Sequence, residues 1–170
     1  AEAVLARFVE RVRDYRATVV VTADPRAAAR EAFAAAGALR IGIAADLDPE
    51  LRPAGLALVE DDVLAPRELD ALDGALTTCA AGCAETGTIA LDGGPGQGRR
   101  ALSLVPDLHV CVIRADDIVE TVPELVAALA HNKYFQRLQV RPSTTIGQFV
   151  VLASPLKEAP PTEFVGTLDG

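Results

Sequence analysis

The chain has 170 residues, of which 50% are hydrophobic and 24% are charged, with three cysteines and neither Met nor Trp. A folded chain of this length hides roughly 70% of the surface that its unfolded form exposes, so it needs no disulfide scaffold, and its composition is not that of a disordered tail. Sixteen basic residues against 24 acidic ones give a formal net charge of −8. A surface of that sign repels phosphate backbones, which argues against nucleic acid as a partner.

The sequence carries no sign of a membrane span or of a secretion signal. Its longest run without a charged residue, 142–156, is interrupted by Pro, Ser, Thr and Gln and is shorter than the roughly 20 apolar residues that a spanning helix needs. The N-terminus has an early acid and lacks the basic region that opens a secretion signal. The odd set Cys79, Cys83 and Cys111 suits a reducing compartment. We therefore expect a cytoplasmic protein without a membrane segment.

Helical and β-branched segments alternate from the N-terminus onward. Residues 2–16 place apolar side chains at helical spacing, and the β-branched run 18–22 follows directly, so a helix and then a buried strand are expected. Asp24-Pro25 is typical of a helix N-cap and first turn, and it opens a helix over 26–36 that Gly37 closes. The alternation continues with strands over 39–44, 55–59 and 86–91 and with a short helix over 67–72 that Pro66 opens.

A nearly continuous apolar strand is predicted over 108–113, and Asp116-Asp117 is predicted to cap a helix over 118–130 in which Pro123 introduces a kink. Continuous apolar runs indicate strands that are buried on both faces. Their alternation with helices predicts an α/β fold, with a mostly parallel sheet flanked by helices. We expect a single domain over 1–170.

The segment 131–170 differs in composition from the rest, because it holds the only Asn, both lysines and three of the four glutamines. Two interpretations remain open for this atypical C-terminal segment. It contains an ordinary last strand over 148–152 with a Pro-rich terminus at 155–161, or its sequence has been altered by truncation, frameshift or a splice.

The densest group of unusual residues lies between 92 and 100, where four glycines occur within six residues and two arginines follow. Glycines let the backbone approach a ligand and turn its N–H groups inward as an anion nest, and arginines are forked donors for phosphate or carboxylate. A small carboxylate or phosphate ligand is therefore predicted. The spacing matches neither a Walker loop nor the dinucleotide fingerprint. The alternative is a mobile hairpin whose arginines face water.

Two further residues are candidates for chemistry. Glu85 precedes a predicted strand, where a carboxylate can act as nucleophile or general base, although Glu-Thr-Gly is also typical of a plain turn. His109 lies in the middle of a predicted strand and is either a base or a hydrogen-bonded structural residue. With Glu85 as the candidate catalytic residue, the predicted ligand-binding set comprises Thr86, Gly87, Gly93, Gly94, Gly96, Gly98, Arg99, Arg100, Ser103 and His109.

Three cysteines are too few for an iron–sulfur cluster, which usually has four cysteine ligands. A zinc site of three cysteines and one histidine requires Cys79 and Cys83 to share a helix face, with His109 and Cys111 on one face of a strand. No Cys-x-x-Cys knuckle is present. We expect neither a metal nor another cofactor.

At these same residues the sequence resembles the LUD domain family, and within it the lactate utilisation protein C branch. The resemblance covers residues 65–130 and is carried by Ala-Glu-Thr-Gly at 84–87, by the glycine cluster, and by Arg-x-x-Ser-Leu-x-Pro-x-x-His at 100–109. It implies a fold similar to the sugar-phosphate isomerase and CoA-transferase-like group and a cytoplasmic bacterial protein. It also implies a role in oxidising L-lactate to pyruvate, with two iron–sulfur proteins of the same pathway as partners.

The resemblance weakens at the C-terminus, where 142–145 keeps only the Pro-Ser-x-Thr core of a family motif and the acidic residues that follow it are absent. Three functions are compatible with the sequence. The chain is a cluster-free component of a lactate-oxidising iron–sulfur system, a stand-alone isomerase or CoA/acyl transferase that reacts through Glu85, or a ligand-binding regulator without chemistry.

Overall fold

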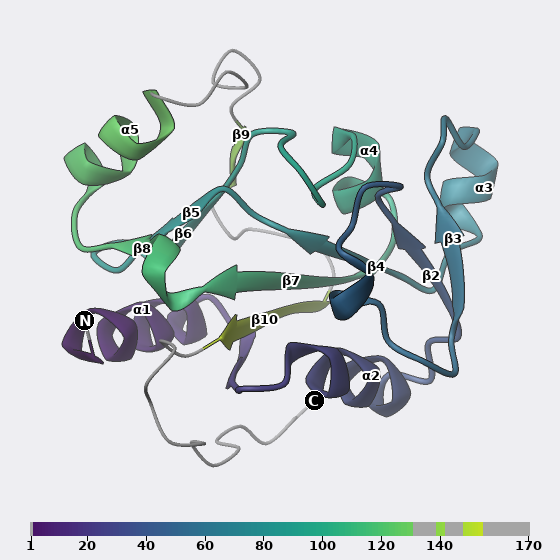
Figure 1. Cartoon of the computed structure of the whole chain (residues 1–170), viewed down its shortest axis with the longest axis horizontal. Coiled ribbons are helices and arrows are strands. Elements are labelled where there is room, and N and C mark those ends of the chain that lie inside the picture. The colour runs from purple at the N-terminus through teal and green to yellow at the C-terminus, as the bar shows by residue number, and fades with distance from the viewer. Residues whose placement is uncertain (1, 131–138, 142–147, 155–170) are drawn as a thin grey trace.

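The computed structural model of the chain describes residues 2–130, 139–141 and 148–154, and its centre is a six-stranded sheet (Figure 1). Every neighbouring pair of strands in this sheet is parallel, so the predicted α/β fold with a mostly parallel sheet is confirmed. The strands follow the order β1 (Thr18–Val21), β10 (Gln148–Ser154), β7 (Leu108–Arg114), β4 (Gly74–Thr78), β2 (Arg40–Ile43) and β3 (Ala57–Glu60).

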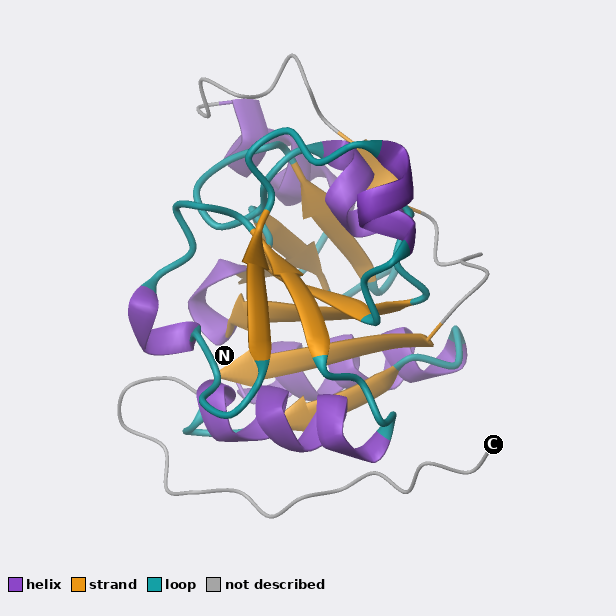
Figure 2. Cartoon of the chain, turned by 90° about the vertical axis from the view of Figure 1, so that its right-hand side faces the viewer, coloured by secondary structure: helices purple, strands orange, loops and turns teal. Residues whose placement is uncertain are grey.

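Helices cover both faces of this sheet (Figure 2). Successive side chains of a strand point to opposite faces, and Val19 and Val20 accordingly belong to two different core clusters. One cluster is covered by α2 (Pro25–Ala35) through the buried Phe33, and the other by α1 (Glu2–Asp14) through the buried Phe8. The core therefore forms two layers with the sheet between them.

The predicted capping of α2 is confirmed. The Asp24 carboxylate accepts a hydrogen bond from Ala27 N at 2.9 Å, Pro25 occupies the first turn, and Gly37 follows the helix with a φ of +67°. A left-handed residue after the last turn is a common helix stop, and glycine adopts it without strain.

A second sheet stands against the first and carries the hairpin that leads to the glycine cluster. Its order is β8 (Ile118–Val119), β5 (Ala81–Cys83), β6 (Thr88–Leu91) and β9 (Gln139–Arg141), and β5 and β6 are antiparallel. Helix α5 (Val122–Ala130) packs on this sheet through Leu125 and Leu129. The predicted strand at 86–91 therefore exists as β6, but it lies outside the parallel sheet.

The structure corrects several expectations about the local elements. Cys79 and Cys83 do not share a helix, because Cys79 lies between β4 and β5 and Cys83 is the last residue of β5. The helix predicted from residue 118 begins at Val122, since 118–119 forms β8 and pairs with β5. Pro123 then lies in the first turn, where it causes no kink. The remaining short helices are η1 (Pro49–Leu51), α3 (Pro66–Asp70), α4 (Arg100–Leu104) and η2 (Ala115–Asp117).

The predicted last strand at 148–152 is confirmed as β10, which inserts between β1 and β7. The Pro-Ser-x-Thr core at 142–145 and the Pro-rich terminus at 155–161 lie outside the described residues. Within the described part of the chain, no helix has the length and apolar character to cross a membrane.

Asp73 joins the start of β2 to the start of β4, because its carboxylate accepts hydrogen bonds from Arg40 N and Leu39 N, both at 2.8 Å. The hydrogen bond from Arg40 N has the larger effect, and together the two bonds hold the pKa of Asp73 below its ordinary value of 3.8. We expect Asp73→Ala to lower the free energy of unfolding at pH 7 by about 1 kcal/mol, the net scale of a typical hydrogen bond, because solvent screens the charge of this exposed carboxylate. Because folding lowers the pKa of Asp73, its carboxylate stabilises the folded chain above pH 3.8, the ordinary pKa of the group. This stabilisation is lost as the pH falls through the pKa of the folded state. The deficit of the variant, measured by urea unfolding, should therefore shrink in acid, and an equal deficit at pH 7 and pH 3 would contradict this role.

Candidate functional site

The carboxyl ends of the six parallel strands meet at one edge of the sheet, which is where ligands bind in open α/β sheets. Residues 92–99, here called the glycine loop, cross this edge. Thr78, the last residue of β4, donates its N–H to Gly96 O at 3.1 Å and its hydroxyl to Pro95 O at 2.7 Å. Gly96 N in turn donates to Asp46 Oδ1 at 3.1 Å, beyond the end of β2. The loop is thus fixed over the ends of β4 and β2.

A reciprocal pair of side chains holds the glycine loop from inside. The buried Asp92 accepts hydrogen bonds at Oδ1 from Gly94 N at 2.9 Å and from Gln97 Nε2 at 2.7 Å. Gln97 Oε1 accepts from Asp92 N at 2.8 Å and from Gly93 N at 3.1 Å. The amides of Gly93, Gly94 and Gly96, which the sequence predicted to face an anion, therefore donate to oxygens of the protein itself. Ligand binding by these glycines stays a prediction.

Arg99 ties the end of the glycine loop to the end of β3. Its Nε and Nη2 donate to the two carboxylate oxygens of Asp61 at 2.7 and 2.8 Å, and Nη2 also donates to Leu64 O. The Asp61 side chain is fully buried and that of Arg99 is 39% exposed. The hydrogen bonds that Arg99 donates to Asp61 raise the pKa of Arg99 above its ordinary value. Because this carboxylate occupies the guanidinium fork, Arg99 serves as an anchor. The next residue, Arg100, is exposed beside the loop.

Ser103 and His109 lie within regular elements and are both buried. Ser103 Oγ donates to Arg100 O at 3.1 Å inside α4. His109 Nε2 lies 2.7 Å from Thr77 Oγ1 on the neighbouring strand β4. This geometry fits the hydrogen-bonded structural interpretation of His109 better than a solvent-facing base.

Glu85, Thr86 and Gly87 form the tip of the β5–β6 hairpin, away from the glycine loop. Glu85 Oε2 accepts a hydrogen bond from Val122 N at 3.2 Å, so this carboxylate caps the start of α5. Thr86 Oγ1 lies 2.8 Å from Thr88 Oγ1, and a Cβ on Gly87 would approach the backbone of Arg11 to 2.8 Å. The four residues of β6 separate this tip from the glycine loop by roughly 13 Å at about 3.3 Å per residue. The predicted site residues therefore fall into two separate groups.

Other residues at the carboxyl edge were not in the predicted set. Cys79 follows β4 directly, and its pKa is raised by the neighbouring Cys111 thiol, by burial, and by the charges of Asp117 and Asp92. A thiol that stays protonated is a poor nucleophile. Burial also raises the pKa of Asp117, against the opposing charge of Arg114. The acidic pair 116–117, interpreted from sequence as a helix cap, thus contributes a half-buried carboxyl to this edge.

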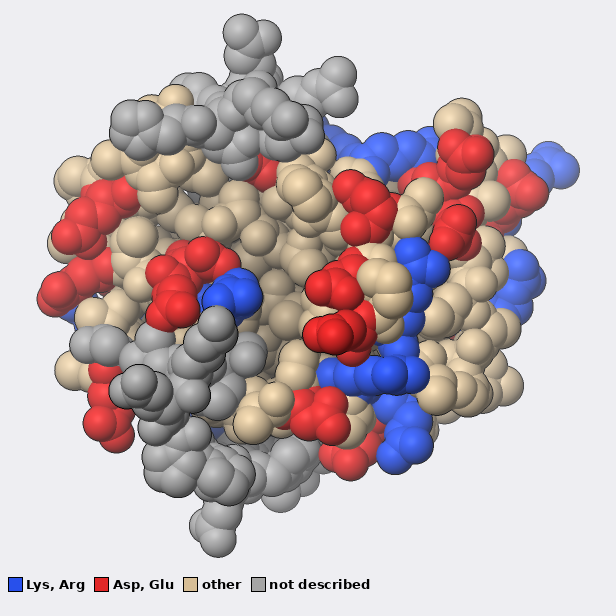
Figure 3. Space-filling view, viewed as in Figure 1, with Lys and Arg blue, Asp and Glu red and all other residues tan. Residues whose placement is uncertain are grey.

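The face of the molecule shown in Figure 3 carries acidic side chains on both flanks of a largely uncharged central area, with basic ones among them. Within the described part of the chain, no three His, Cys, Asp or Glu side chains are grouped so as to hold a metal ion.

Comparison with known proteins places this geometry in a family. The sequence pattern of the LUD domain matches residues 59–159, more than half of the chain. The chain belongs to the LUD domain family. Over 128 residues it is 41% identical to "Lactate utilization protein C" of Deinococcus radiodurans, an alignment that covers 75% of this chain and 60% of that relative. The chain therefore spans about 60% of the length of the curated relative that it matches.

A solved structure resembles this LUD domain over nearly its whole length. The crystal structure of a DUF162 family protein from Deinococcus radiodurans superposes with a TM-score of 0.82 at 35% sequence identity. The match covers 91% of this chain and 97% of the other. The resemblance to the LUD domain family that the sequence predicted over residues 65–130 is thereby confirmed, and the similarity extends to the N-terminal strands and helices.

Gly93 and Gly96 form a matched pair for testing which contacts hold the glycine loop in place. Gly93 and Gly96 have φ values of +75° and +74°, but only the Cβ of an alanine at 96 would meet a neighbour, Thr78 Oγ1 at 2.7 Å. Gly93→Ala should therefore cost only the left-handed conformation, about 1 kcal/mol. Gly96→Ala should cost about 2–3 kcal/mol, since it also displaces Thr78 from the loop. Equal losses in chemical unfolding would show that the Thr78 contact does not hold the loop.

Arg99 and Arg100 provide a second matched pair, because both are arginines at the start of α4 and only Arg99 pairs with Asp61. Arg99→Ala leaves the buried Asp61 carboxylate without its cation and should lower Tm clearly more than Arg100→Ala. Arg99→Lys keeps the charge without the planar fork, so its Tm should lie between those of Arg99→Ala and the unsubstituted chain. Thermal unfolding monitored by circular dichroism measures all three. Equal Tm values for the two alanine variants would contradict an anchoring role for Arg99.

Proposed function

We propose that this LUD domain serves in lactate utilisation, as a cluster-free component of an iron–sulfur system that oxidises L-lactate to pyruvate. The observation that supports this most is the 41% identity, over 75% of the chain, to a protein named for lactate utilisation. The Ala-Glu-Thr-Gly and Arg-x-x-Ser-Leu-x-Pro-x-x-His elements both lie within the matched LUD segment 59–159.

The chemistry of lactate oxidation supports a division of labour between chains. Conversion of L-lactate to pyruvate releases two electrons and two protons, which a redox group must accept. This chain contains three cysteines, whereas an iron–sulfur cluster usually takes four cysteine ligands. We therefore assign the clusters to two partner iron–sulfur proteins and place the complex in the cytoplasm.

The carboxyl edge of the sheet is the proposed place of contact with a small carboxylate or with a partner. Arg100 is the exposed cation beside the glycine loop, since Arg99 is held by Asp61. A carboxylate such as that of lactate pairs favourably with a guanidinium group. The acidic side chains at this edge, Asp46, Asp92 and Asp117, disfavour a highly charged anion, which favours a monocarboxylate over a phosphate.

Catalysis through Glu85 has less structural support. The Glu85 carboxylate is engaged with Val122 N and lies at the opposite end of β6 from the glycine loop. A transferase that uses Glu85 as nucleophile would require that carboxylate near the bound acyl group. The geometry therefore favours the component of an iron–sulfur system over a stand-alone isomerase or CoA transferase.

Deletion of the gene in its host tests the proposal. The deletion strain should not grow on L-lactate, and its lysate should not reduce an electron acceptor when L-lactate is added. Its growth on pyruvate should be unaffected. An intact copy of the gene should restore both activities. Growth on lactate that does not change after deletion would refute the role, and the domain should then be tested with sugar phosphates and CoA esters.

Complementation with variants separates the roles of the site residues. Glu85→Gln keeps an oxygen that can accept from Val122 N, so we expect it to restore growth fully. Arg100→Ala should restore it less well than Arg67→Ala, a control at an exposed arginine of α3. Loss of function in Glu85→Gln at an unchanged Tm would instead support a reacting carboxylate.

A further inference from the structure

We propose that Cys79 and Cys111 form a reversible disulfide that joins β4 to β7 beside the glycine loop. This inference is independent of the role in lactate utilisation. It rests on the position of the two thiols in the sheet, and all three cysteines of the chain are free thiols in the structure.

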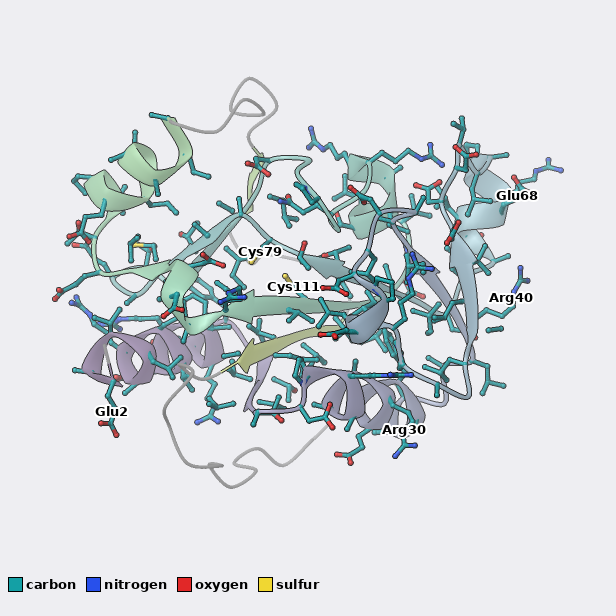
Figure 4. All side chains as sticks on the ribbon, in the orientation of Figure 1. Glu2, Arg30, Arg40, Glu68, Cys79 and Cys111 are labelled. Atoms are coloured by element: carbon teal, nitrogen blue, oxygen red, sulfur yellow. The ribbon has the colours of Figure 1, made fainter. Side chains whose placement is uncertain are left out.

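The sheet register places the two thiols on the same side of neighbouring strands. Thr77 of β4 is paired with Cys111 of β7, and Cys79 comes two residues after Thr77, so its side chain emerges on the same face. Both cysteines belong to the cluster that α1 covers, Cys111 as a fully buried member and Cys79 as a partly buried one. Figure 4 shows the labelled cysteines with their sulfur atoms side by side.

The Cys79 side chain leans toward β7. Its Sγ donates to Val112 O at 3.8 Å, and Val112 is the residue directly after Cys111. The Cys111 thiol is also the largest influence on the titration of Cys79. Cys83, by contrast, lies in β5, and its Sγ contacts Glu120 O at 3.9 Å. The chain thus has one pair of neighbouring thiols and one thiol apart from them.

Closing the bond requires a small movement of Cys79. In ideal parallel strands, residues offset by two positions have Cα atoms about 8 Å apart, and a disulfide needs them within about 7 Å. Cys79 lies between β4 and β5, outside both strands, so it is better able to move than Cys111 in the centre of the sheet. Its neighbour Thr78 holds Pro95 and Gly96 through two hydrogen bonds. Oxidation should therefore alter the glycine loop.

The reaction needs an oxidant of the peroxide class. The Cys79 thiolate attacks one oxygen of hydrogen peroxide, the O–O bond breaks, and Cys79 becomes a sulfenic acid while hydroxide takes up a proton to leave as water. The Cys111 sulfur then attacks the Cys79 sulfur, the S–O bond breaks, and a second water leaves. In sum, two thiols are oxidised to a disulfide and one peroxide is reduced to two waters. The protonated state of Cys79 at neutral pH makes the first step slow, and the rate should rise with pH.

Intact-protein and peptide mass spectrometry test the proposal on the full chain. After treatment with hydrogen peroxide and alkylation of the remaining thiols, the chain should show a loss of about 2 Da, a single alkylated cysteine, and a peptide that links Cys79 to Cys111. Dithiothreitol should reverse the change. Cys83→Ser, the matched control, should give the same linked peptide. Cys79→Ser and Cys111→Ala should each abolish it, and the first keeps the proposal testable if the second does not fold.

Three outcomes would overturn the proposal. The first is a gain of oxygen on Cys79 without a link, and the second is a link that includes Cys83. The third is complete alkylation of all three cysteines in the denatured protein after peroxide treatment at pH 7 and at pH 9. Faster formation of the link at pH 9 than at pH 7 would support it, as would a change in amide hydrogen exchange at 92–98 that the Cys79→Ser variant does not show.

Discussion

Strand β7 is the element through which the rest of the fold is connected. Its residues 108–113 are buried, and it forms parallel ladders with β4 on one side and β10 on the other. Neither neighbour is adjacent to it in sequence, so these pairings incur loop-closure entropy that only the burial of both sheet faces offsets. The two core clusters meet across β7, because Val110 and Val112 belong to one and Cys111 and Ile113 to the other. The position of the carboxyl edge therefore depends on this strand.

The glycine loop illustrates how a segment that appears to be a ligand site can be satisfied within the protein. Its amides donate to Asp92, Gln97 and Asp46, and its arginine donates to Asp61. Gly94 and Gly96 are buried, so their amides would be costly without an acceptor. These bonds hold the loop without a ligand, and an incoming carboxylate that bound the same amides would displace one of these oxygens. Such a loop is better suited to presenting a defined surface than to closing around an anion.

Much of the fold follows from local sequence, but the central strand β4 and the site contacts do not. The capping of α2 by Asp24 and the apolar run of β7 are properties of contiguous residues. Strands β4 and β5 consist largely of small residues, which give little apolar pattern. Small residues are needed in these strands because large side chains pack directly against them. A Cβ on Gly74 would lie 3.0 Å from Phe33, and one on Gly82 would lie 2.7 Å from Ile113. Asp46 and Asp61, the partners of the glycine loop, lie 50 and 38 residues from Gly96 and Arg99. No local pattern connects residues at such separations.

The same contacts change what the family motifs indicate about chemistry. The Glu of Ala-Glu-Thr-Gly caps α5, and the His of the second motif hydrogen-bonds within the sheet. Both motifs are therefore accounted for by the hydrogen bonding of the fold itself, and a match to them identifies the LUD architecture more directly than it identifies a reacting group. The exposed Arg100 and the half-buried Asp117 are further polar groups near the carboxyl edge, and they take part in neither of these contacts. Experiments on chemistry at this edge should therefore start from these side chains.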